Sequence, residues 1–243
     1  ADGIHFNIRL EEDRLCTLVL MGARPDGTKE TIAVQDGYRE STESWKSLLR
    51  NLKGRGMQPP VVAVGDGALG FWAAVREVWP ETREQRCWVH KMANVLDKLP
   101  KRLQPKAKRM LREIMWADTR QQANEAIDAF DSEFSPKHDR AVKCLVKDRQ
   151  ALLAYFDLPA QHWKHLRTTN IIESPFATVR LRQRVTKGAG NRTKALTMAF
   201  KLLEMAQMRF RRLDAAKMLP IVRAGGCFID GIQMERKNAE EAA

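Results

Sequence analysis

The sequence of 243 residues has little cysteine and no long apolar run, and these absences exclude several classes of protein. Its four cysteines, Cys16, Cys87, Cys144 and Cys227, have no disulfide-like spacing, which indicates a reducing, cytoplasmic setting. Apolar stretches are too short to cross a bilayer, so we expect no membrane partner. Residues 1–10 lack the charged and apolar regions of a signal peptide. Since no initiator Met is present, we expect the chain to be cut from a longer protein.

Motifs of several common enzyme classes are absent as well. The chain contains no Gly-x-Ser-x-Gly nucleophile elbow and no His-Glu-x-x-His metalloprotease motif. The segment KGAGN at 187–191 lacks the spacing of a phosphate-binding P-loop, so we interpret it as a flexible loop. The sequence has no internal repeat and no low-complexity tract, which favours an ordinary globular fold.

Positive charge is what the sequence has in excess. The formal net charge is +12, which favours a polyanionic partner such as nucleic acid. Residues 174–217 hold eleven lysines and arginines against two acids, Glu204 and Asp214. Because most of the excess falls in this one segment, we expect a surface that faces phosphate groups rather than a basic surface that only aids solubility.

The first third of the chain has the pattern of strands. Short apolar or alternating runs at 4–10, 14–23 and 29–35 are separated by turn-forming residues, including Pro-Asp-Gly at 25–27. Strands with such short connections predict an antiparallel meander.

The apolar period then changes to that of an α/β unit. Residues 41–56 predict a helix with serine and threonine as candidate N-caps. The apolar run at 59–65 predicts a buried strand of the parallel kind. A helix over about 69–79 and a strand over 84–90 follow. The first part therefore has the order β-β-β-α-β-α-β and belongs to the α/β class.

Residues 91–165 are predicted to be almost entirely helical. Within them, 105–116 places its apolar residues on one face, and 119–130 begins with a Thr-x-x-Gln capping box. We interpret this block as an insertion into the α/β unit or a layer upon it. A last helix-rich stretch spans about 171–213, and the polar end of the chain is expected to fray.

Asp66 lies between two glycines at the end of the predicted buried strand 59–65. In α/β sheets, ligands bind outside the carboxyl ends of the strands. Gly67 would allow a sharp turn into the next helix, and Gly65 would remove a side chain where a ligand comes close. For an isolated Asp-Gly pair, a plain turn is the better interpretation. Whether Asp66 is a turn residue or a ligand-binding acid therefore depends on the other acids of the chain.

Two further acids stand at the start of an element. Asp2 precedes the first strand. In several α/β folds the first and fourth strands are neighbours, which would place Asp2 next to Asp66. By itself, Asp2 carries no signal of function. Glu173 lies close to Pro175, which belongs in the first turn of a helix because an interior proline loses a backbone bond and clashes. The helix is therefore predicted to begin near Ile172, with Glu173 at its exposed start.

The helix that carries Glu173 also carries arginines on the same face. At 100° per residue, Arg180 and Arg184 fall within about 20° of the direction of Glu173. A solvated charged face with a Glu near the helix N-terminus is the commoner meaning of this pattern. Arginines aligned behind a metal-binding acid also suit a phosphate backbone.

Three blocks of the sequence resemble the signature blocks of Mutator-type bacterial insertion-sequence transposases. They are DGIHFNIR, VGDGALGFWAAVREVWPETREQRCWVHKMANVLDKLPK and HWKHLRTTNIIESPFATVRLRQR, in the same order along the chain. The resemblance implies an RNase H-like mixed sheet flanked by helices, with an all-α insertion before the last catalytic acid. It divides the chain into a first part of the core at 1–90, an insertion at 91–165, a last part at 166–217 and a C-terminal tail at 218–243.

The resemblance also implies a DDE-type site formed by Asp2, Asp66 and Glu173, with Mg²⁺ or Mn²⁺ as the cofactor. Two divalent ions roughly 3.5–4 Å apart stabilise the attacking and leaving oxygens of a phosphodiester. Carboxylates are the hard oxygen ligands that Mg²⁺ prefers. We therefore expect the three acids to hold two ions. Because like charges raise one another's pKa, the site makes sense mainly when loaded.

Other residues of the matching blocks are expected to contact DNA. The family has a Cys-x-x-His pair in the strand after the second acid, here Cys87 and His90, which we expect to be structural or DNA-proximal. A zinc site shared with His162 and His165 is the weaker alternative. The expected DNA-binding residues are Asn170, Arg180, Arg182, Arg184, Lys187, Arg192 and Lys194.

The sequence therefore predicts a transposase catalytic domain that cuts and joins double-stranded DNA at insertion-sequence ends. Its expected partners are the terminal inverted repeats and target DNA, and a homodimer is expected when the protein is assembled on DNA. The resemblance places it in the bacterial cytoplasm, associated with the nucleoid. The alternatives are a catalytically silent DNA-binding fragment and an RNase H-like nuclease that only hydrolyses.

Overall fold

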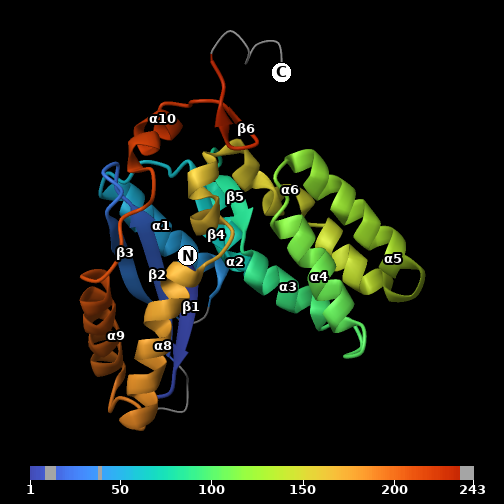
Figure 1. Cartoon of the computed structure of the whole chain (residues 1–243). Helices are drawn as coiled ribbons and strands as arrows, with labels where there is room; N and C mark the ends of the chain where they lie inside the picture. The colour runs from blue at the N-terminus through green and yellow to red at the C-terminus, as the bar shows by residue number, and fades with distance from the viewer. Residues whose placement is uncertain (9–14, 38–39, 236–243) are drawn as a thin grey trace.

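A computed structural model describes residues 1–8, 15–37 and 40–235 (Figure 1). The connection expected between the first two strands lies outside these residues, as does most of the polar C-terminal end. The protein is a mixed α/β structure, as the sequence predicts. A sheet with helices on both faces makes up one part, and a bundle of helices lies beside it.

The first three strands form the predicted antiparallel meander. β1 (Asp2–Phe6) pairs with β2 (Leu15–Ala23), and β2 pairs with β3 (Lys29–Gly37), in the order β1-β2-β3. The tight turn between β2 and β3 is closed by the Asp26 carboxylate, which accepts a hydrogen bond from the Thr28 amide at 2.9 Å. Gly27 adopts a φ of 82° there, a conformation that favours glycine.

A second pair of strands is parallel. β4 (Val62–Gly65) pairs with β5 (Arg83–Arg86), and α2 (Leu69–Val78) is the crossover between them. The terminal ammonium of Ala1 donates a hydrogen bond to the Val64 carbonyl oxygen at 2.8 Å. The start of β1 therefore lies beside β4, near the edge where β4 ends.

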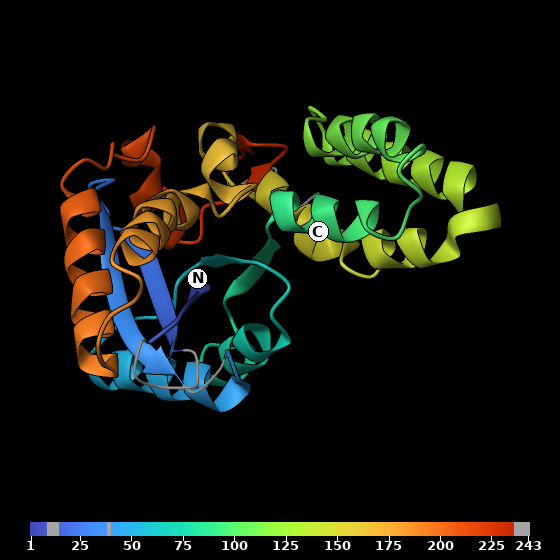
Figure 2. The same cartoon turned by 90° about the horizontal axis from the view of Figure 1, so that it is seen from below.

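Alternating side chains of β2 bury both faces of the sheet. Leu18 and Leu20 pack with α1 (Thr42–Gly54) and α2, whereas Val19 packs with α8 (Asn170–Val185) and α9 (Arg192–Gln207). Figure 2 shows the sheet between α9 on one side and α1 on the other. α1 begins as predicted, because the Ser41 side chain accepts a hydrogen bond from the Ser44 amide.

The predicted helical block has its own core. It comprises α3 (Trp88–Leu96), α4 (Gln104–Met115), α5 (Arg120–Val146), α6 (Arg149–Leu152) and α7 (Trp163–Leu166), with short 3₁₀ turns at Ala154–Asp157 and Ala160–His162. Their apolar faces, from Val95 to Trp163, form one cluster. Thr119 caps α5 as predicted, and α5 bends at His138, two residues after Pro136.

The prediction of a strand over 84–90 is wrong for its second half. β5 ends at Arg86, Cys87 is the residue before α3, and α3 begins at Trp88. The reason is tertiary: Trp88 is fully buried in the core of the helical block, and its indole N–H donates to the Leu152 carbonyl oxygen at 3.0 Å. Trp88 is thus a core residue.

The segment that follows α9 folds back over the helical block. A 3₁₀ turn at Ala216–Met218 and α10 (Leu219–Arg223) precede a hairpin of β6 (Phe228–Ile229) and β7 (Ile232–Gln233). The Asp230-Gly231 turn has positive φ at both residues, as this kind of hairpin requires. The Gly231 amide donates to the Phe156 carbonyl oxygen at 3.0 Å.

Candidate active site

The Asp66 loop joins the end of β4 to α2. The Asp66 carboxylate accepts a hydrogen bond from the Ala68 amide at 2.8 Å, and its carbonyl oxygen accepts one from the Trp72 indole at 2.8 Å. Arg86 also donates to this carbonyl oxygen. The half-buried side chain of Asp66 is thus held at the carboxyl end of a strand, where ligands of α/β sheets bind.

The structure corrects the reasons proposed for the two glycines. At Gly65, an added Cβ would lie 3.1 Å from the Trp72 ring and 3.2 Å from the Phe71 ring, so this glycine makes room for aromatic packing rather than for a ligand. Gly67 is not among the residues with positive φ. There, an added Cβ would lie 2.6 Å from an Arg86 guanidinium nitrogen. Gly67 therefore makes room for Arg86.

Asp2 lies beside Asp66, at the point where β1 meets β4. Its Oδ1 atom accepts a hydrogen bond from the Gly3 amide at 2.8 Å. Burial, and next the negative charge of Asp66, raise the pKa of Asp2 to about 6. The structure therefore brings these two acids into one electrostatic cluster.

Glu173 lies in the first turn of α8, as predicted, although the helix begins two residues earlier than expected. Both the Ile172 and Glu173 amides donate to the Thr169 carbonyl oxygen, and this contact starts the helix at Asn170. Pro175 is therefore inside the helix rather than in its first turn. The Thr169 hydroxyl donates to Glu173 Oε1 at 2.5 Å and orients the carboxylate.

His90 connects Glu173 to the other acids. Its Nδ1 atom lies 3.8 Å from Glu173 Oε1. The pKa of His90 is raised to about 9, chiefly by a hydrogen bond with Cys87 and against the opposing effect of burial, with smaller contributions from the charges of Cys87, Glu173 and Asp66. Asp66 and Glu173 thus both act on one imidazole.

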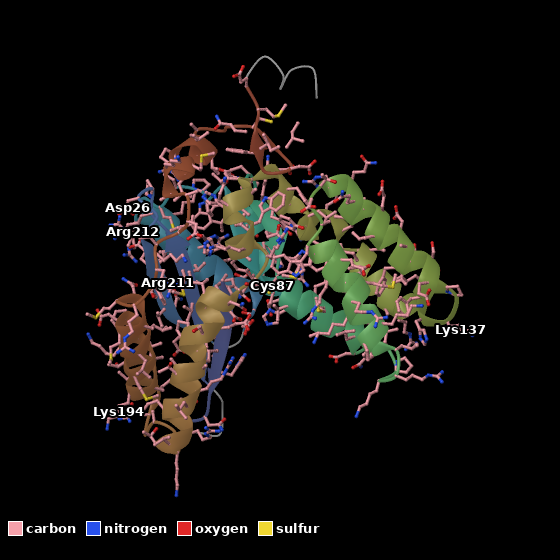
Figure 3. The ribbon with its side chains drawn as sticks, in the orientation of Figure 1. Asp26, Cys87, Lys137, Lys194, Arg211 and Arg212 are labelled. Carbon is pink, nitrogen blue, oxygen red and sulfur yellow. The ribbon has the colours of Figure 1, made fainter. Side chains whose placement is uncertain are left out.

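Cys87 lies at the centre of the molecule, between the sheet and the helical block (Figure 3). Its Sγ atom lies 3.3 Å from the Thr169 hydroxyl oxygen, as a second and longer acceptor of the one proton that this hydroxyl donates to Glu173. Burial raises the pKa of the Cys87 thiol, but hydrogen bonds with His90 and Thr169 outweigh it and lower the pKa overall. The ligand atoms of Cys87, His90 and Glu173 lie within 4.8 Å of one another, which makes this trio a candidate metal-binding set.

The structure does not support the zinc alternative. His162 Nε2 lies 3.3 Å from the Ala215 carbonyl oxygen, and His165 Nε2 lies 4.0 Å from an Asp214 carboxylate oxygen. Within residues 1–8, 15–37 and 40–235, these two histidines are in neither of the ligand clusters close enough to hold an ion.

Glu40 is a member of the acidic cluster that the sequence analysis missed. Its carboxylate occupies the space where a Cβ on Gly3 would lie, 2.0 Å away, and it contacts His5 Nε2 at 3.2 Å. Burial, and next the charge of Asp66, raise the pKa of Glu40. Glu40 stands before the helix cap Ser41 and belongs to no sequence motif, so the sequence gives no signal for it. Its contact with Gly3 in the folded structure is what places it near Asp2.

Within the described residues, the sets of ligand atoms that lie within 4.8 Å of one another are Cys87, His90 and Glu173, and His5, Cys16 and Glu40, so Asp2 and Asp66 belong to neither set. Asp2, Asp66, Glu173 and Glu40 all offer carboxylate oxygens, the donors that Mg²⁺ and Mn²⁺ prefer. Burial is the larger cause of the raised pKa of Asp2 and the charge of Asp66 the second, and a cation bound beside the two acids would oppose both effects.

The predicted basic residues differ in their surroundings. Arg192 forms a two-pronged ion pair with Asp36 at 2.6 and 2.9 Å and so ties α9 to β3. Arg180 is exposed, and its guanidinium lies 5.8 Å from the Phe176 ring. Lys194 projects from the end of α9 opposite to Arg211 and Arg212 (Figure 3). The other predicted members are also exposed: Asn170, Arg182, Arg184 and Lys187.

Comparison with known proteins assigns the chain to a family. Residues 1–212 match the family described as Transposase, Mutator family. The chain belongs to the Mutator family of transposases. It is 53% identical over 236 residues to the transposase for insertion sequence element IS6120 of Mycolicibacterium smegmatis, which covers 97% of this chain and 73% of that protein.

Two other relatives of this Mutator-family chain are also transposases of insertion sequences. The transposase for IST2 of Acidithiobacillus ferrooxidans is 49% identical over 91% of this chain and 75% of its own length. The transposase for ISRM5 of Rhizobium meliloti is 34% identical over 70% of this chain and 43% of its own length. Among the helices that the structure describes, none has the length and apolar character needed to cross a membrane.

Proposed function

We propose that this chain is the catalytic domain of an insertion-sequence transposase, which cuts and joins DNA with Asp2, Asp66 and Glu173 as its catalytic acids. The single observation that carries the proposal is that His90 Nδ1 lies 3.8 Å from Glu173 Oε1, while the charge of Asp66 acts on both His90 and Asp2. Acids from three distant elements are thus linked electrostatically. The relatives are named transposases for insertion sequence elements, which supports the same activity.

The order of elements supports an RNase H-like core for this domain. The antiparallel β1-β2-β3 sheet and the parallel pair β4 and β5 are separate sheets, and the Ala1 ammonium brings the start of β1 to the end of β4. The helical block lies between β5 and the Glu173 helix in the sequence, where an insertion before the last acid is expected. The helices α1 and α9 cover the two faces of the first sheet.

Asp2, Asp66 and Glu173 would hold two divalent cations, with Glu40 as an additional carboxylate nearby. Such ions, when bound, stabilise the attacking and leaving oxygens of an in-line phosphoryl displacement. The chain itself orients the acids: the Ala68 amide holds Asp66, and the Thr169 hydroxyl holds Glu173. Protonated His90 places a hydrogen-bond donor for a phosphate oxygen beside them.

The exposed residues Arg180 and Arg184, which lie on the same helix as Glu173, would bind the phosphate backbone of DNA. Guanidinium groups suit this role because they form forked hydrogen bonds with phosphate oxygens. A homodimer on DNA is part of the proposal, because joining an element to a target requires its two ends to be brought together.

The test is an assay on linear DNA that carries the ends of the element encoding this chain, with Mn²⁺ or Mg²⁺ and a target plasmid. Strand transfer supports the proposal, nicking alone supports a nuclease, and binding without cleavage supports a silent DNA-binding domain. Asp66→Asn should abolish cleavage and keep salt-sensitive DNA binding. Asp139→Asn, on the exposed surface of α5, is the matched control and should cut like the parent. Equal cutting by Asp66→Asn would show that the site assignment is wrong.

A further inference from the structure

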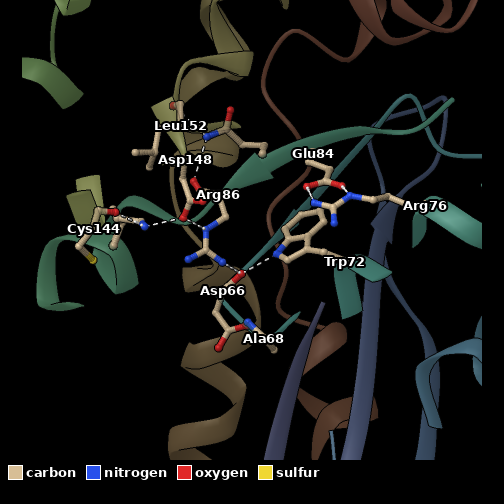
Figure 4. A network of polar contacts seen from close by, with 11 residues as sticks. Asp66, Ala68, Trp72, Arg76, Glu84, Arg86, Cys144, Asp148 and Leu152 are labelled. Carbon is tan, nitrogen blue, oxygen red and sulfur yellow. Dashed lines mark hydrogen bonds and ion pairs between the residues drawn. The ribbon is translucent and has the colours of Figure 1, made fainter. Parts of the chain in front are cut away.

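We propose that Arg86 and Asp148 are positioning residues for Asp66, so that the helical block sets the geometry of the active site. The effect on metal binding and catalysis rests on the proposed function, whereas the effect on the Asp66 loop does not. Figure 4 shows the contacts that connect the two parts of the molecule.

The Arg86 side chain fixes the peptide group of Asp66. It is only 8% exposed, and one of its terminal nitrogens donates to the Asp66 carbonyl oxygen. The Trp72 indole donates to the same oxygen from the other element of the loop, at 2.8 Å. Two donors on one carbonyl restrict rotation of the peptide plane, and therefore the direction in which the Asp66 carboxylate leaves the chain.

The sequence makes room for Arg86 at this position. Gly67 follows Asp66, and any larger residue there would place its Cβ 2.6 Å from an Arg86 guanidinium nitrogen. The loop backbone and the guanidinium therefore lie in direct contact. A movement of Arg86 would be transmitted to the loop with no intervening side chain.

Asp148 holds Arg86 from the side of the helical block. It lies between α5 and α6, and its Oδ2 atom is 3.2 Å from Arg86 Nε. This contact is an ion pair without hydrogen-bond geometry, since Arg86 Nε has no hydrogen-bond acceptor. The same carboxylate oxygen accepts from Lys91 Nζ at 2.5 Å, and the Lys91 side chain is only 1% exposed.

One carboxylate therefore balances two buried cations. Removing it would leave both uncompensated, which is unfavourable in a poorly hydrated interior. Lys91 has a second acceptor, the Cys144 carbonyl oxygen at 2.8 Å. Among the described residues, Arg86 would in contrast be held only by its hydrogen bond to the Asp66 carbonyl oxygen, and its guanidinium could then rotate away from that oxygen more easily.

Docking of the helical block on β5 does not depend on these charges. The Gln85 side chain donates to the Leu152 carbonyl oxygen at 3.2 Å and accepts from the Tyr155 amide at 2.8 Å. The Trp88 indole also donates to Leu152. These neutral buried contacts attach the block by themselves, so the distinctive effect of Asp148 is the orientation of Arg86.

The first arm of the test is hydrogen exchange of the loop peptide spanning residues 65–70, measured without metal or DNA. Asp148→Asn should speed its exchange about tenfold, because local opening becomes easier when a buried ion pair is lost. Arg86→Lys should have the same effect. It keeps the charge that faces Asp148 but lacks the fork that reaches Asp66.

Arg149→Gln is the matched control for the first arm. Arg149 is next to Asp148 in sequence and binds Asn124 and Asp128 on the far side of the block. This variant should lower the melting temperature and leave exchange of the loop unchanged. Unchanged loop exchange in both Asp148→Asn and Arg86→Lys, or an equal increase in Arg149→Gln, would overturn the proposal.

The second arm is a double-mutant cycle on Mn²⁺ affinity, measured by calorimetry. Asp148→Asn should weaken binding about tenfold when Asp66 is present, as loss of a supporting contact around a metal site does. In the Asp66→Asn background it should cause no further loss. Equal losses in both backgrounds would contradict an effect through Asp66. If Asp66→Asn itself leaves Mn²⁺ affinity unchanged, the proposed metal site fails, and loop exchange still decides the positioning proposal.

Discussion

His90 Nδ1 lies 3.8 Å from Glu173 Oε1, across the junction between α3 and the first turn of α8. The two residues are 83 positions apart in the chain, and most of the helical block lies between them. Thr169 supports this contact, because its hydroxyl donates to Glu173 and lies 3.5 Å from His90. Contacts between α3, at the start of the helical block, and the beginning of α8, which follows the block, thus hold His90 and Glu173 together.

Protonation of His90 should stabilise the fold over a defined pH range. Its pKa is raised from 6.5 to about 9, chiefly by the hydrogen bond with Cys87. A raised histidine pKa contributes stability that is fully present below the unfolded pKa and is lost as the pH rises through the folded one. We expect the melting temperature in metal-free buffer to fall between about pH 6.5 and pH 9.

His90→Gln should reduce that pH dependence, and Cys87→Ser should lower the pKa of His90 measured by NMR. Thermal melts at a series of pH values check the first expectation. A slope that is the same in His90→Gln as in the parent would contradict it.

Asp2 should likewise make stability fall as the pH rises, but in the acidic range. Burial and the charge of Asp66 raise its pKa from 3.8 to about 6. The folded state then binds more protons than the unfolded state between these values, so stability falls as the pH rises from 3.8 to 6. Asp2→Asn should remove this loss in metal-free melts. Asp66→Asn should lower the pKa of Asp2 only in part, because burial, the larger cause, remains.

Arg180→Ala and Arg192→Ala should separate DNA contact from stability. Arg180 is exposed on the face of Glu173, so its loss should weaken binding to all DNA sequences and reduce the salt slope by about 1. Arg192 is paired with Asp36, so its replacement should mainly lower the melting temperature. Filter binding at several salt concentrations and thermal melts measure the two effects. An unchanged salt slope in Arg180→Ala would count against the contact.

Thr169→Val should remove the hydrogen bond from residue 169 to the Glu173 carboxylate, with little change in the shape of the side chain at that position. Thr169 is buried, and its hydroxyl donates to the Glu173 carboxylate at 2.5 Å. Loss of a hydrogen bond to a charged group costs about 1.5–3 kcal/mol. Urea unfolding should show a loss of this size or smaller, since Glu173 keeps some contact with solvent. Thr169→Ser retains the hydroxyl and should stay close to the parent; an equal loss in Ser and Val would rule out the hydrogen bond as the cause.

Most local elements were predictable because their signals lie within a few residues. Ser41 and Thr119 cap the helices that follow them, and the Pro-Asp-Gly turn separates β2 from β3 as expected. Glu173 falls in the first turn of its helix as predicted, although the proline argument placed the helix start two residues too late and Pro175 lies inside the helix. The prediction failed at 87–90, where burial of Trp88 in a distant core begins a helix early.

The sequence by itself determined the types and order of the elements, the excess of positive charge after residue 174 and the resemblance that identified three acids. Only the tertiary structure decided that Ala1 would lie on β4 and so bring Asp2 to Asp66, that Glu40 would join them, and that Arg192 would pair with Asp36. The physical reason is the distance along the chain over which each interaction acts. Periodicity and capping act between neighbours in the chain, whereas the electric field around an acid depends on every group that packing brings near it.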